Sequence, residues 1–379
     1  MNLRSSSRKR VAKDVEASDT ANASPYRGSR AKPSQAQSSK RAKNNTSSTD
    51  SKENGNGHTQ INDDEAQLYD RQIRLWGLDA QTRMRNASVC IVNFGALSTE
   101  IIKNLVLAGI GALTVVDPEN VAPKDLGAGF FFRQEDVGQN RAISARERIL
   151  DLNPRVKVDA VTKPLSDLDD DFYTQFQFLV LTQADLDTML RIDDICRAKK
   201  IKLFAAGIYG LTGYAFADLV EHVYTTANPA AKDDTSAPKD ITRTIQYHSL
   251  AETLEKRWDN TTDKRARDTV RPKFYAVLAL LTYQQRHNAP PSSSEADVDR
   301  LVAIKDELMK RANVNPSFVT LDLLRSLAAT HSAELSPIAA LAGGLLSQEI
   351  LRAIGEKDPP MDNVLVIDGL EPQAGIAGY

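Results

Sequence analysis

Cysteine is almost absent from this sequence, which has 2 among 379 residues. So few thiols exclude a disulfide framework and a C-x-x-C zinc site. Cys90 stands in an apolar strand pattern, and Cys196 stands in a helical stretch. Because a reactive thiolate needs exposure and a nearby positive charge, we interpret both as buried packing residues rather than nucleophiles.

Long apolar runs are missing as well. The sequence has no run of eighteen apolar residues, and its N-terminus lacks the apolar segment of a secretory signal. We therefore expect neither a membrane span nor secretion, but a cytosolic or nuclear protein. The hydrophobic content of 41% is sufficient for a substantial core. The length fits one large domain with an insertion, or two domains.

Positive charge gathers at the start of the chain. Residues 1–60 hold 12 Lys and Arg against 5 Asp and Glu, whereas the remainder holds 36 against 45. This segment has almost no large apolar residues, so it cannot bury enough surface to offset the entropy of ordering. We predict a disordered basic N-terminal tail over 1–62. Its basic clusters fit nuclear import, nucleic-acid contacts or simply a solvated tail: Arg8-Lys9-Arg10 with Lys13, and Lys40-Arg41 with Lys43.

Strand and helix patterns alternate after the tail. Asn62 begins a capping box that opens a helix over 66–76, and Gly77 can end that helix in a left-handed conformation. A second short helix is expected from Asp79. The following elements alternate: strand 89–94, helix 96–108, strand 113–117, helix 138–151, strands near 156–161 and at 177–182, helix 185–198 and strand 202–207. This order predicts an α/β fold with a doubly wound, mostly parallel, Rossmann-like sheet.

The pattern changes after Leu211. Residues 213–224 alternate well enough for a strand or hairpin, and 225–245 have the composition of a polar loop. Helices are predicted at 275–287, 297–312 and 321–331, then an apolar helix that should lie buried under the sheet, then a closing strand at 364–368. We therefore predict three parts: 63–226 as the first part of a Rossmann-like domain, 227–334 as an inserted polar loop and helical region, and 335–379 as the C-terminal helix and strand that complete the domain.

The turn after the first strand is a degraded dinucleotide motif. Where G-x-G-x-x-G is expected, the chain has Asn93, Gly95 and Ser98. Asn tolerates positive φ, so the tight turn can survive, whereas the Ser98 side chain should push on the contact between helix and strand. Asp117 stands about where an acidic residue would bind a ribose hydroxyl. From these residues alone, Gly95 and Asp117 indicate either a nucleotide site or, as we favour, a scaffold without one.

Several separated segments resemble the adenylation fold of the ubiquitin-like-modifier-activating enzymes, which bacterial sulfur-carrier adenylators share. They occur in the order of that family, over roughly 63–379: QLYDRQIRLWGLDAQTRMRNASVCIV, NLVLAGIGALTVVDPENV, DVGQNRAISARERILDLNP and LAGGLLSQEILRAIGEKDPPMDNVLVIDG. Within the family, length and detail are most similar to the smaller, non-catalytic subunits of the heterodimeric SUMO-activating enzymes.

The resemblance also shows what this chain lacks. The family's phosphate-binding arginine follows the ribose aspartate, but here the segment from Asp125 has no arginine until Arg133. The family's Mg²⁺ aspartate falls on Ala184, and Asp185 beside it is shifted by one residue. Neither cysteine matches the one that takes the modifier as a thioester. The resemblance therefore implies that Gly95 and Asp117 are vestigial, that this subunit binds no metal or cofactor itself, and that its pocket is empty or filled by a side chain.

One functional motif remains whole in the helix YDRQIRLWG. In the family its first arginine, here Arg71, contacts the γ-phosphate of ATP bound in the partner subunit. A guanidinium supplied in trans neutralises charge while the α-phosphate is attacked. Arg74, one turn later, is a weaker candidate for the same task. In a chain without this resemblance, Arg71 would be read as a member of a surface salt bridge.

The resemblance implies the regulatory subunit of a SUMO-activating enzyme. Its partners would be the large catalytic subunit, which binds ATP and Mg²⁺, then SUMO and, indirectly, the downstream conjugating enzyme, with no membrane and no nucleic acid. We expect a nuclear location, with the cytoplasm also open. The alternatives are the equivalent subunit for another modifier, a stand-alone Rossmann-type nucleotide-binding enzyme, and a purely structural scaffold.

Overall fold

A computed structural model describes residues 61–232, 238–255, 271–369 and 373–377. All of them belong to one compact unit, Asp50–Tyr379. The predicted tail over 1–62 lies outside the described residues except for its last two. The division of the rest into 63–226, 227–334 and 335–379 stays a prediction.

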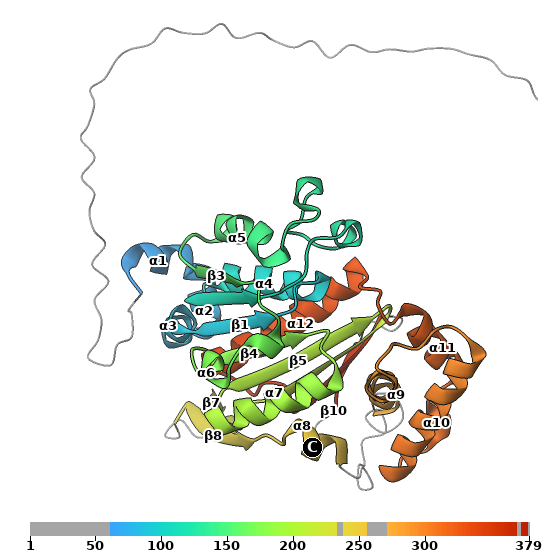
Figure 1. The fold of residues 1–379 in the computed structure, drawn as a ribbon. Coiled ribbons are helices and arrows are strands. Elements are labelled where there is room, and N and C mark those ends of the chain that lie inside the picture. Colours follow the sequence, from blue (N-terminus) through green and yellow to red (C-terminus); the bar gives the residue numbers. More distant parts are fainter. Residues whose placement is uncertain (1–60, 233–237, 256–270, 370–372, 378–379) are drawn as a thin grey trace, which may run out of the picture. The chain divides into compact units, whose positions relative to one another are not determined.

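The centre of the fold is an eight-stranded sheet with the order β10-β9-β6-β5-β4-β1-β2-β3 (Figure 1). Neighbouring strands from β3 to β5 are parallel, whereas β6 is antiparallel to both β5 and β9, and β10 is antiparallel to β9. The predicted α/β, doubly wound and mostly parallel sheet is confirmed. Its strands are β1 (Ser88–Val92), β2 (Ala112–Val116), β3 (Lys157–Val161), β4 (Phe178–Thr182), β5 (Lys202–Tyr209), β6 (Thr212–Asp218), β9 (Val364–Asp368) and β10 (Gln373–Ala377).

Helices cover both faces of this sheet. The α-helices are α1 (Asp63–Leu68), α2 (Asp70–Trp76), α3 (Leu78–Asn86), α4 (Ala96–Ala108), α5 (Arg141–Leu152), α6 (Asp170–Tyr173), α7 (Leu186–Lys199), α8 (Leu250–Glu255), α9 (Arg271–His287), α10 (Glu295–Arg311), α11 (Leu321–Thr330) and α12 (Ser336–Gly355). Short 3-10 turns include η1 (Pro123–Gly127), η2 (Gln134–Asp136), η3 (Leu165–Asp167), η4 (Pro229–Lys232) and η6 (Pro316–Phe318).

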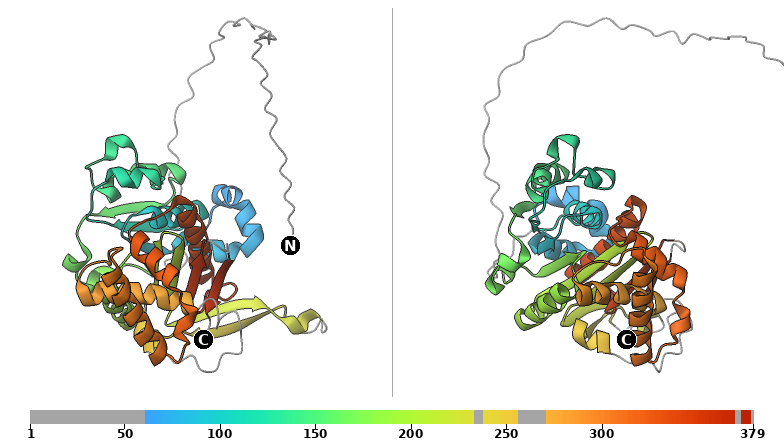
Figure 2. Two further views of the ribbon diagram at one scale, coloured as in Figure 1. Left: turned by 90° about the vertical axis from the view of Figure 1, so that its right-hand side faces the viewer. Right: turned by 45° about the vertical axis from the view of Figure 1, so that its right-hand side comes forward.

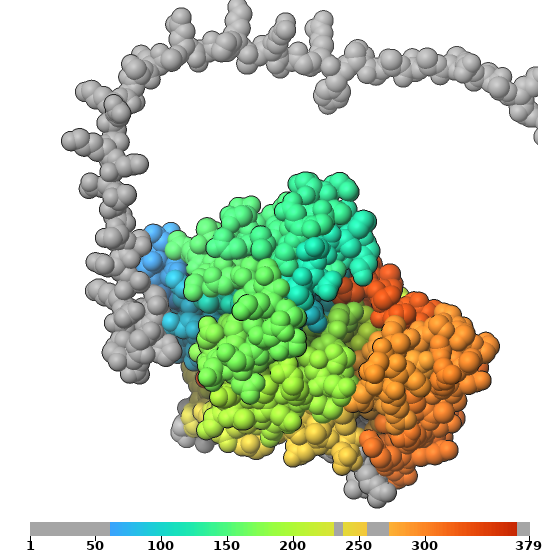
Figure 3. Space-filling model, in the orientation of Figure 1, coloured from blue at the N-terminus to red at the C-terminus, as the bar shows by residue number. Residues whose placement is uncertain are grey.

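The alternating side chains of each strand feed two separate cores. Cys90 and Val92 of β1 point into a core shared with α7 and α9–α11. Val89 and Ile91 point into a second core shared with α3, α4, α5 and α12. This is the period of two that a strand buried on both faces requires. On the side drawn in Figure 3, α9–α11 (orange) form one lobe and the segment with η1 and η2 (teal) forms another.

The helix α12 lies under the sheet, as predicted, and packs along α4. By length and composition alone it is apolar enough to cross a membrane, although the sequence led us to expect no membrane span. Of its apolar window 61% is buried inside this fold, however. A core helix of a doubly wound sheet needs the same apolar composition. The position of α12 in the core therefore accounts for its sequence.

The first helix is broken, contrary to the prediction of one helix over 66–76. The capping box at Asn62 is present, but α1 ends before Tyr69, whose ψ of 17° separates it from α2. The Tyr69 ring is buried, and its hydroxyl accepts a hydrogen bond of 2.8 Å from Nδ2 of Asn153. Gly77 ends α2 with φ 90° and ψ 160°, an extended conformation at positive φ rather than the expected left-handed helical one.

Residues 213–245 match expectation in part. Of the two forms expected for 213–224, a strand or a hairpin, the strand is present as β6. The backbone turns at Val220, with φ 61°, into β7 (Glu221–Ala227), which pairs with β8 (Asp240–Gln246) and not with β6. The expected polar loop contains β8, which pairs with β7 in a separate two-stranded ribbon. The left view of Figure 2 shows this ribbon extending from the body. Most side chains of β8 are exposed, so the strand lacks the apolar stripe by which we identify strands.

Candidate functional site

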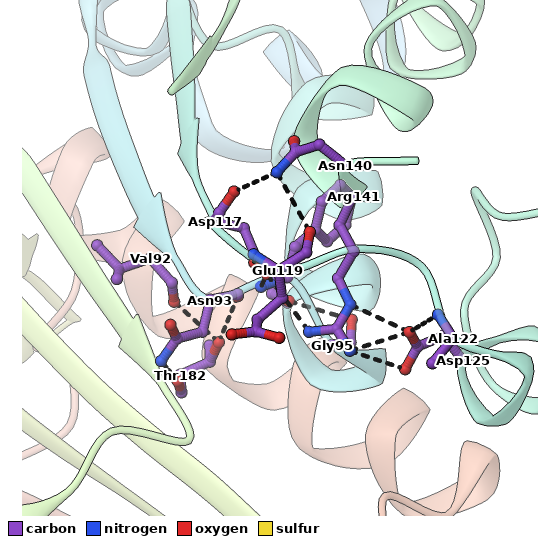
Figure 4. Close-up of polar contacts among 12 residues, drawn as sticks. Val92, Asn93, Gly95, Asp117, Glu119, Ala122, Asp125, Asn140, Arg141 and Thr182 are labelled. Carbon is purple, nitrogen blue, oxygen red and sulfur yellow. Dashed lines mark hydrogen bonds and ion pairs between the residues drawn. The ribbon is translucent and has the colours of Figure 1, made fainter. Parts of the chain in front are cut away.

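The degraded turn keeps the shape of a nucleotide-binding turn. Asn93 follows β1 with φ 65°, as expected for a residue that replaces the first glycine. Its side-chain Nδ2 donates to the Thr182 carbonyl at 2.7 Å, and the Thr182 hydroxyl donates back to the Asn93 carbonyl at 2.8 Å (Figure 4). These two bonds join the carboxyl ends of β1 and β4, so the tight turn is stabilised without a glycine.

Ser98, in place of the third glycine, is fully buried. Its hydroxyl donates to the Gly95 carbonyl within the same helix at 3.1 Å. Ser98 was expected to push on the contact between helix and strand. Its hydroxyl instead turns back onto the first turn of its own helix, where it has a hydrogen-bond partner.

A carboxylate from a distant part of the chain lies on this turn. Glu334, just before α12, accepts from the backbone N–H of Ala96 at 2.8 Å and of Leu97 at 3.3 Å. A Cβ on Gly95 would collide with the Glu334 carboxylate. The N-terminus of α4, where a dinucleotide turn binds pyrophosphate, therefore holds an anion that belongs to the protein.

Asp117 faces inward at the end of β2. Its carboxylate accepts from the backbone N–H of Phe94 at 2.5 Å and of Glu119 at 2.7 Å, and it lies 3.7 Å from the Arg141 guanidinium. Burial raises the pKa of Asp117, and these hydrogen bonds and Arg141 oppose the rise. The side chain is 1% exposed. Both carboxylate oxygens thus stabilise the loop after β2, and their hydrogen-bonding capacity is largely used before a ribose hydroxyl could bind.

The cavity over the turn has a volume of about 530 Å³, and its lining includes the carboxylates of Glu334 and Asp117. Arg141 is its buried cation, but Nε and Nη2 bind the Asp125 carboxylate at 3.0 and 2.9 Å (Figure 4). Asn140 caps α5 and holds the Asp117 and Glu119 carbonyls through its Nδ2. The buried cation of this cavity, Arg141, is therefore already paired within the protein, and the other cation of its lining is Lys124.

Metal-binding and nucleophilic groups are not assembled at the turn. Ala184 is buried at the end of β4, and Asp185 caps α7 by accepting from the backbone N–H of Thr188 at 2.8 Å. Within the described ranges, no group of three or more His, Cys, Asp or Glu side chains could hold a metal ion. Cys90 and Cys196 are both buried, as predicted, and burial raises the pKa of each thiol.

Arg71 and Arg74 lie on α2 and are both exposed, but only one of them is paired. Arg74 forms an ion pair with Asp70 at 3.0 Å. No side chain in the described part of the chain binds the Arg71 guanidinium. Next to it, Gln72 donates to the Leu107 carbonyl at the far end of α4, which is about 16 Å along the helix from the turn. Arg71 is therefore out of reach of the turn in its own chain.

Exposed leucines lie on α2 and on the helices around it. They are Leu68, Leu75, Leu78 and Leu107, and Leu75 is 76% exposed. Leu75 and Leu107 line a groove of about 550 Å³ between α2, α3, α4 and α12, and its apolar lining also includes Trp76 and Leu351. We call these exposed leucines and this groove the α2 surface. Large exposed apolar side chains that line a groove are typical of a protein-binding surface.

Two site residues escaped the sequence analysis. Glu334 stands 238 residues from Ala96, and nothing in its local sequence indicates the contact. Arg141 was visible in the segment NRAISARERILD, but its pairing with Asp125 depends on how the loop around η1 folds. Side-chain contacts between residues distant in the sequence can be identified only when the fold is known.

Comparison with known proteins gives one consistent result. The sequence model of the ThiF family matches residues 69–376. The chain is 35% identical over 329 residues to the SUMO-activating enzyme subunit 1 of Bos taurus, which covers 82% of this chain and 94% of that protein. The Homo sapiens protein of the same name is 34% identical over the same shares. That of Danio rerio is 35% identical over 341 residues, 85% of this chain and 96% of that protein.

Proposed function

The chain belongs to the ThiF family, and from this premise we propose that it is the regulatory, non-catalytic subunit of a SUMO-activating enzyme. The observation that carries the proposal is the contrast between two places in one chain. The turn that would hold a nucleotide carries Glu334, while Arg71 stands unpaired on an apolar surface. Similarity to proteins named SUMO-activating enzyme subunit 1 supports the choice of modifier.

This subunit binds neither ATP nor Mg²⁺ at its own turn. Glu334 occupies the anion position, Asp117 is committed to backbone groups, and Ala184 offers no metal ligand. A triphosphate placed there would meet the Glu334 carboxylate at the N-terminus of α4, and Arg141, the buried cation of the cavity, is already paired. ATP and Mg²⁺ belong in the large catalytic subunit.

Arg71 acts in the site of that partner. There the carboxylate of the SUMO C-terminal glycine attacks the α-phosphorus of ATP, an acyl-adenylate forms, and pyrophosphate leaves. A guanidinium on the γ-phosphate neutralises charge that the leaving pyrophosphate carries. The acyl group then passes to a cysteine of the partner as a thioester, and AMP is released. Arg74 is a weak candidate for the same role, because Asp70 already neutralises it.

The α2 surface is the place where the large subunit docks. Burial of Leu75 and Leu107 would bring the partner over α2, which carries Arg71 next to Gln72 in the groove lining. Arg71, which is about 16 Å along α4 from the turn of its own chain, would then face the nucleotide of the partner. SUMO and, through the complex, the conjugating enzyme follow as further partners, and the complex works in the nucleus.

SUMO-dependent exchange of pyrophosphate into ATP tests this assignment. It is measured with this chain alone, with the large subunit alone and with the two mixed. Exchange in the mixture alone is expected. Exchange by the isolated chain would instead support a stand-alone nucleotide-binding enzyme, and activity with a different modifier would reassign the subunit to that modifier.

A further inference from the structure

We propose that Glu334 is a built-in anion that closes the phosphate position of the turn, so that removing this carboxylate creates a binding site for phosphate groups. The inference deepens the proposed function, since it explains physically why this subunit holds no nucleotide. It concerns the contact between the residue before α12 and the first turn of α4.

The N-terminus of α4 needs an anion for two reasons. Its first backbone N–H groups have no partner inside the helix, and the helix dipole adds partial positive charge there. The N-cap residue, Gly95, has no side chain to accept these hydrogen bonds, and the first turn of α4 has no acidic residue. Both oxygens of Glu334 supply what is missing, by accepting from Ala96 and Leu97.

Gly95 permits this close approach. A methyl group at this position would collide with the Glu334 carboxylate. The absence of a side chain at this glycine also lets pyrophosphate approach the backbone in a working dinucleotide turn. The carboxylate and a phosphate group would therefore compete for the same volume and the same N–H donors.

The backbone around Glu334 is fixed by contacts with Gly210. The Gly210 N–H donates to the Ala333 carbonyl at 2.8 Å, and Gly210 and Glu334 form a parallel bridge. The next residue, Leu335, is the N-cap of α12. Because the backbone on both sides is fixed, the carboxylate is present at a high effective concentration, and a free anion must displace it against this advantage.

The cavity would accept a phosphate once this carboxylate is gone. Its volume is about 530 Å³ with Glu334 in place, and its lining includes the first turn of α4 and the side chain of Lys124. The substitution Glu334→Ala removes one negative charge from the cavity and frees two donors. The site is then the ordinary anion site of a helix N-terminus that follows a strand.

The test uses the full chain with Glu334→Ala, Glu334→Gln and the control Glu119→Gln. Glu119 also lines the cavity, but the hydrogen bond it makes to Asp117 comes from its backbone. Melting temperatures are measured in acetate, sulfate and pyrophosphate at constant ionic strength, and pyrophosphate binding is measured by calorimetry. Glu334→Gln keeps the size and an acceptor oxygen, so it covers the case in which the alanine variant does not fold.

Glu334→Ala should lower Tm by about 2–4 °C, the size expected for a lost helix cap. Acetate and sulfate should restore Tm for this variant and leave the wild type and Glu119→Gln unchanged. Pyrophosphate should bind Glu334→Ala at least about tenfold more tightly than the wild type, which corresponds to one displaced hydrogen-bonded anion. Glu334→Gln should lie between the two, because its amide oxygen still accepts while its charge is gone.

Equal pyrophosphate affinity in the wild type and in both Glu334 variants would overturn the inference, as would anion rescue of Glu119→Gln to the same extent. Pyrophosphate exchange by the mixed subunits separates this outcome from the proposed function. Glu334 is far from α2, so Glu334→Gln should support the large subunit as well as the wild type does, whether or not its own cavity binds phosphate.

Discussion

Arg141 binds Asp125 through Nε and Nη2 at 3.0 and 2.9 Å while its Nη1 lies 3.7 Å from the buried Asp117. One guanidinium thus compensates two carboxylates from the loop that follows β2. The side chains of Arg141 and Asp125 are only 14% and 12% exposed, so solvent screens the pair weakly.

Arg141→Met should destabilise the protein by about 3 kcal/mol or more, because removing one member of a buried ion pair leaves uncompensated charge. Urea unfolding of the two proteins gives the difference. Arg325→Met is the matched control, since Arg325 pairs with Glu295 at the surface and should contribute less than about 1 kcal/mol. A loss for Arg141→Met no larger than that of the control would contradict a structural role for this pair.

Arg71→Ala should slow adenylation in the two-subunit complex by about 100-fold or more, the effect of removing one donor that stabilises transition-state charge. Arg74→Ala, which removes an arginine already paired with Asp70, should change the rate less than about threefold. Single-turnover formation of the SUMO adenylate measures both rates. The affinity of the subunits, measured in parallel, should be unchanged, and equal rates for the two variants would remove Arg71 from the mechanism.

Leu75→Asp should weaken association with the large subunit by about 10- to 100-fold, because burial of a leucine contributes about 1.5–3 kcal/mol and the aspartate adds a desolvation cost. Isothermal calorimetry or analytical ultracentrifugation measures the change. Leu321→Asp on α11 serves as a control, since Leu321 is also an exposed leucine but lies outside the α2 surface. Intact assembly of Leu75→Asp would place the interface elsewhere.

Asp193 on α7 should make stability depend on pH. Its Oδ2 accepts from the Leu250 N–H at 2.6 Å, and its Oδ1 has no hydrogen-bond partner among the described residues. Burial, followed by repulsion from Asp218, raises the pKa of Asp193 to about 8. The folded state therefore holds a proton that the unfolded state loses near pH 4.

The sign of this effect follows from linkage. Because the folded pKa is raised, the contribution of the Asp193 proton to stability is full below about pH 4 and is lost as pH rises towards about 8. The unfolding free energy of the wild type, relative to Asp193→Asn, should fall steadily across that window. Chemical unfolding of both proteins at a series of pH values gives the difference, and a flat difference would mean that Asp193 is ionised in the fold.

The sequence predicted the fold well where the pattern was repetitive. Helix 96–108 and the strand at 364–368 match α4 and β9 to the residue, because a buried helix or strand shows its period directly. The strand β8 was missed since its mostly exposed side chains show no such period. The break at Tyr69 was missed because it depends on a contact with Asn153, more than eighty residues away.

The site was predictable only in its local part. Positive φ at Asn93 follows from residue type and position and is present. The one-residue shift of Asp185 was also visible in the sequence, and the structure shows this side chain capping α7. The contact of Glu334 with Ala96 could not be foreseen, because the two residues are 238 positions apart in the sequence and meet only in the folded chain. The role proposed for Arg71 depends on a partner subunit, which is not encoded in the sequence of this chain.

Gly109 ends α4 in a left-handed conformation, and at the same time its bare Cα is the surface on which the Tyr69 ring rests, since a Cβ there would collide with that ring. Tyr69 in turn marks the break from which α2 starts, two residues before Arg71. The position of Arg71 thus depends in part on Gly109, a residue whose evident role is to end α4. A methyl group at Gly109 would displace the Tyr69 ring, tilt α2 and move Arg71 without contacting it.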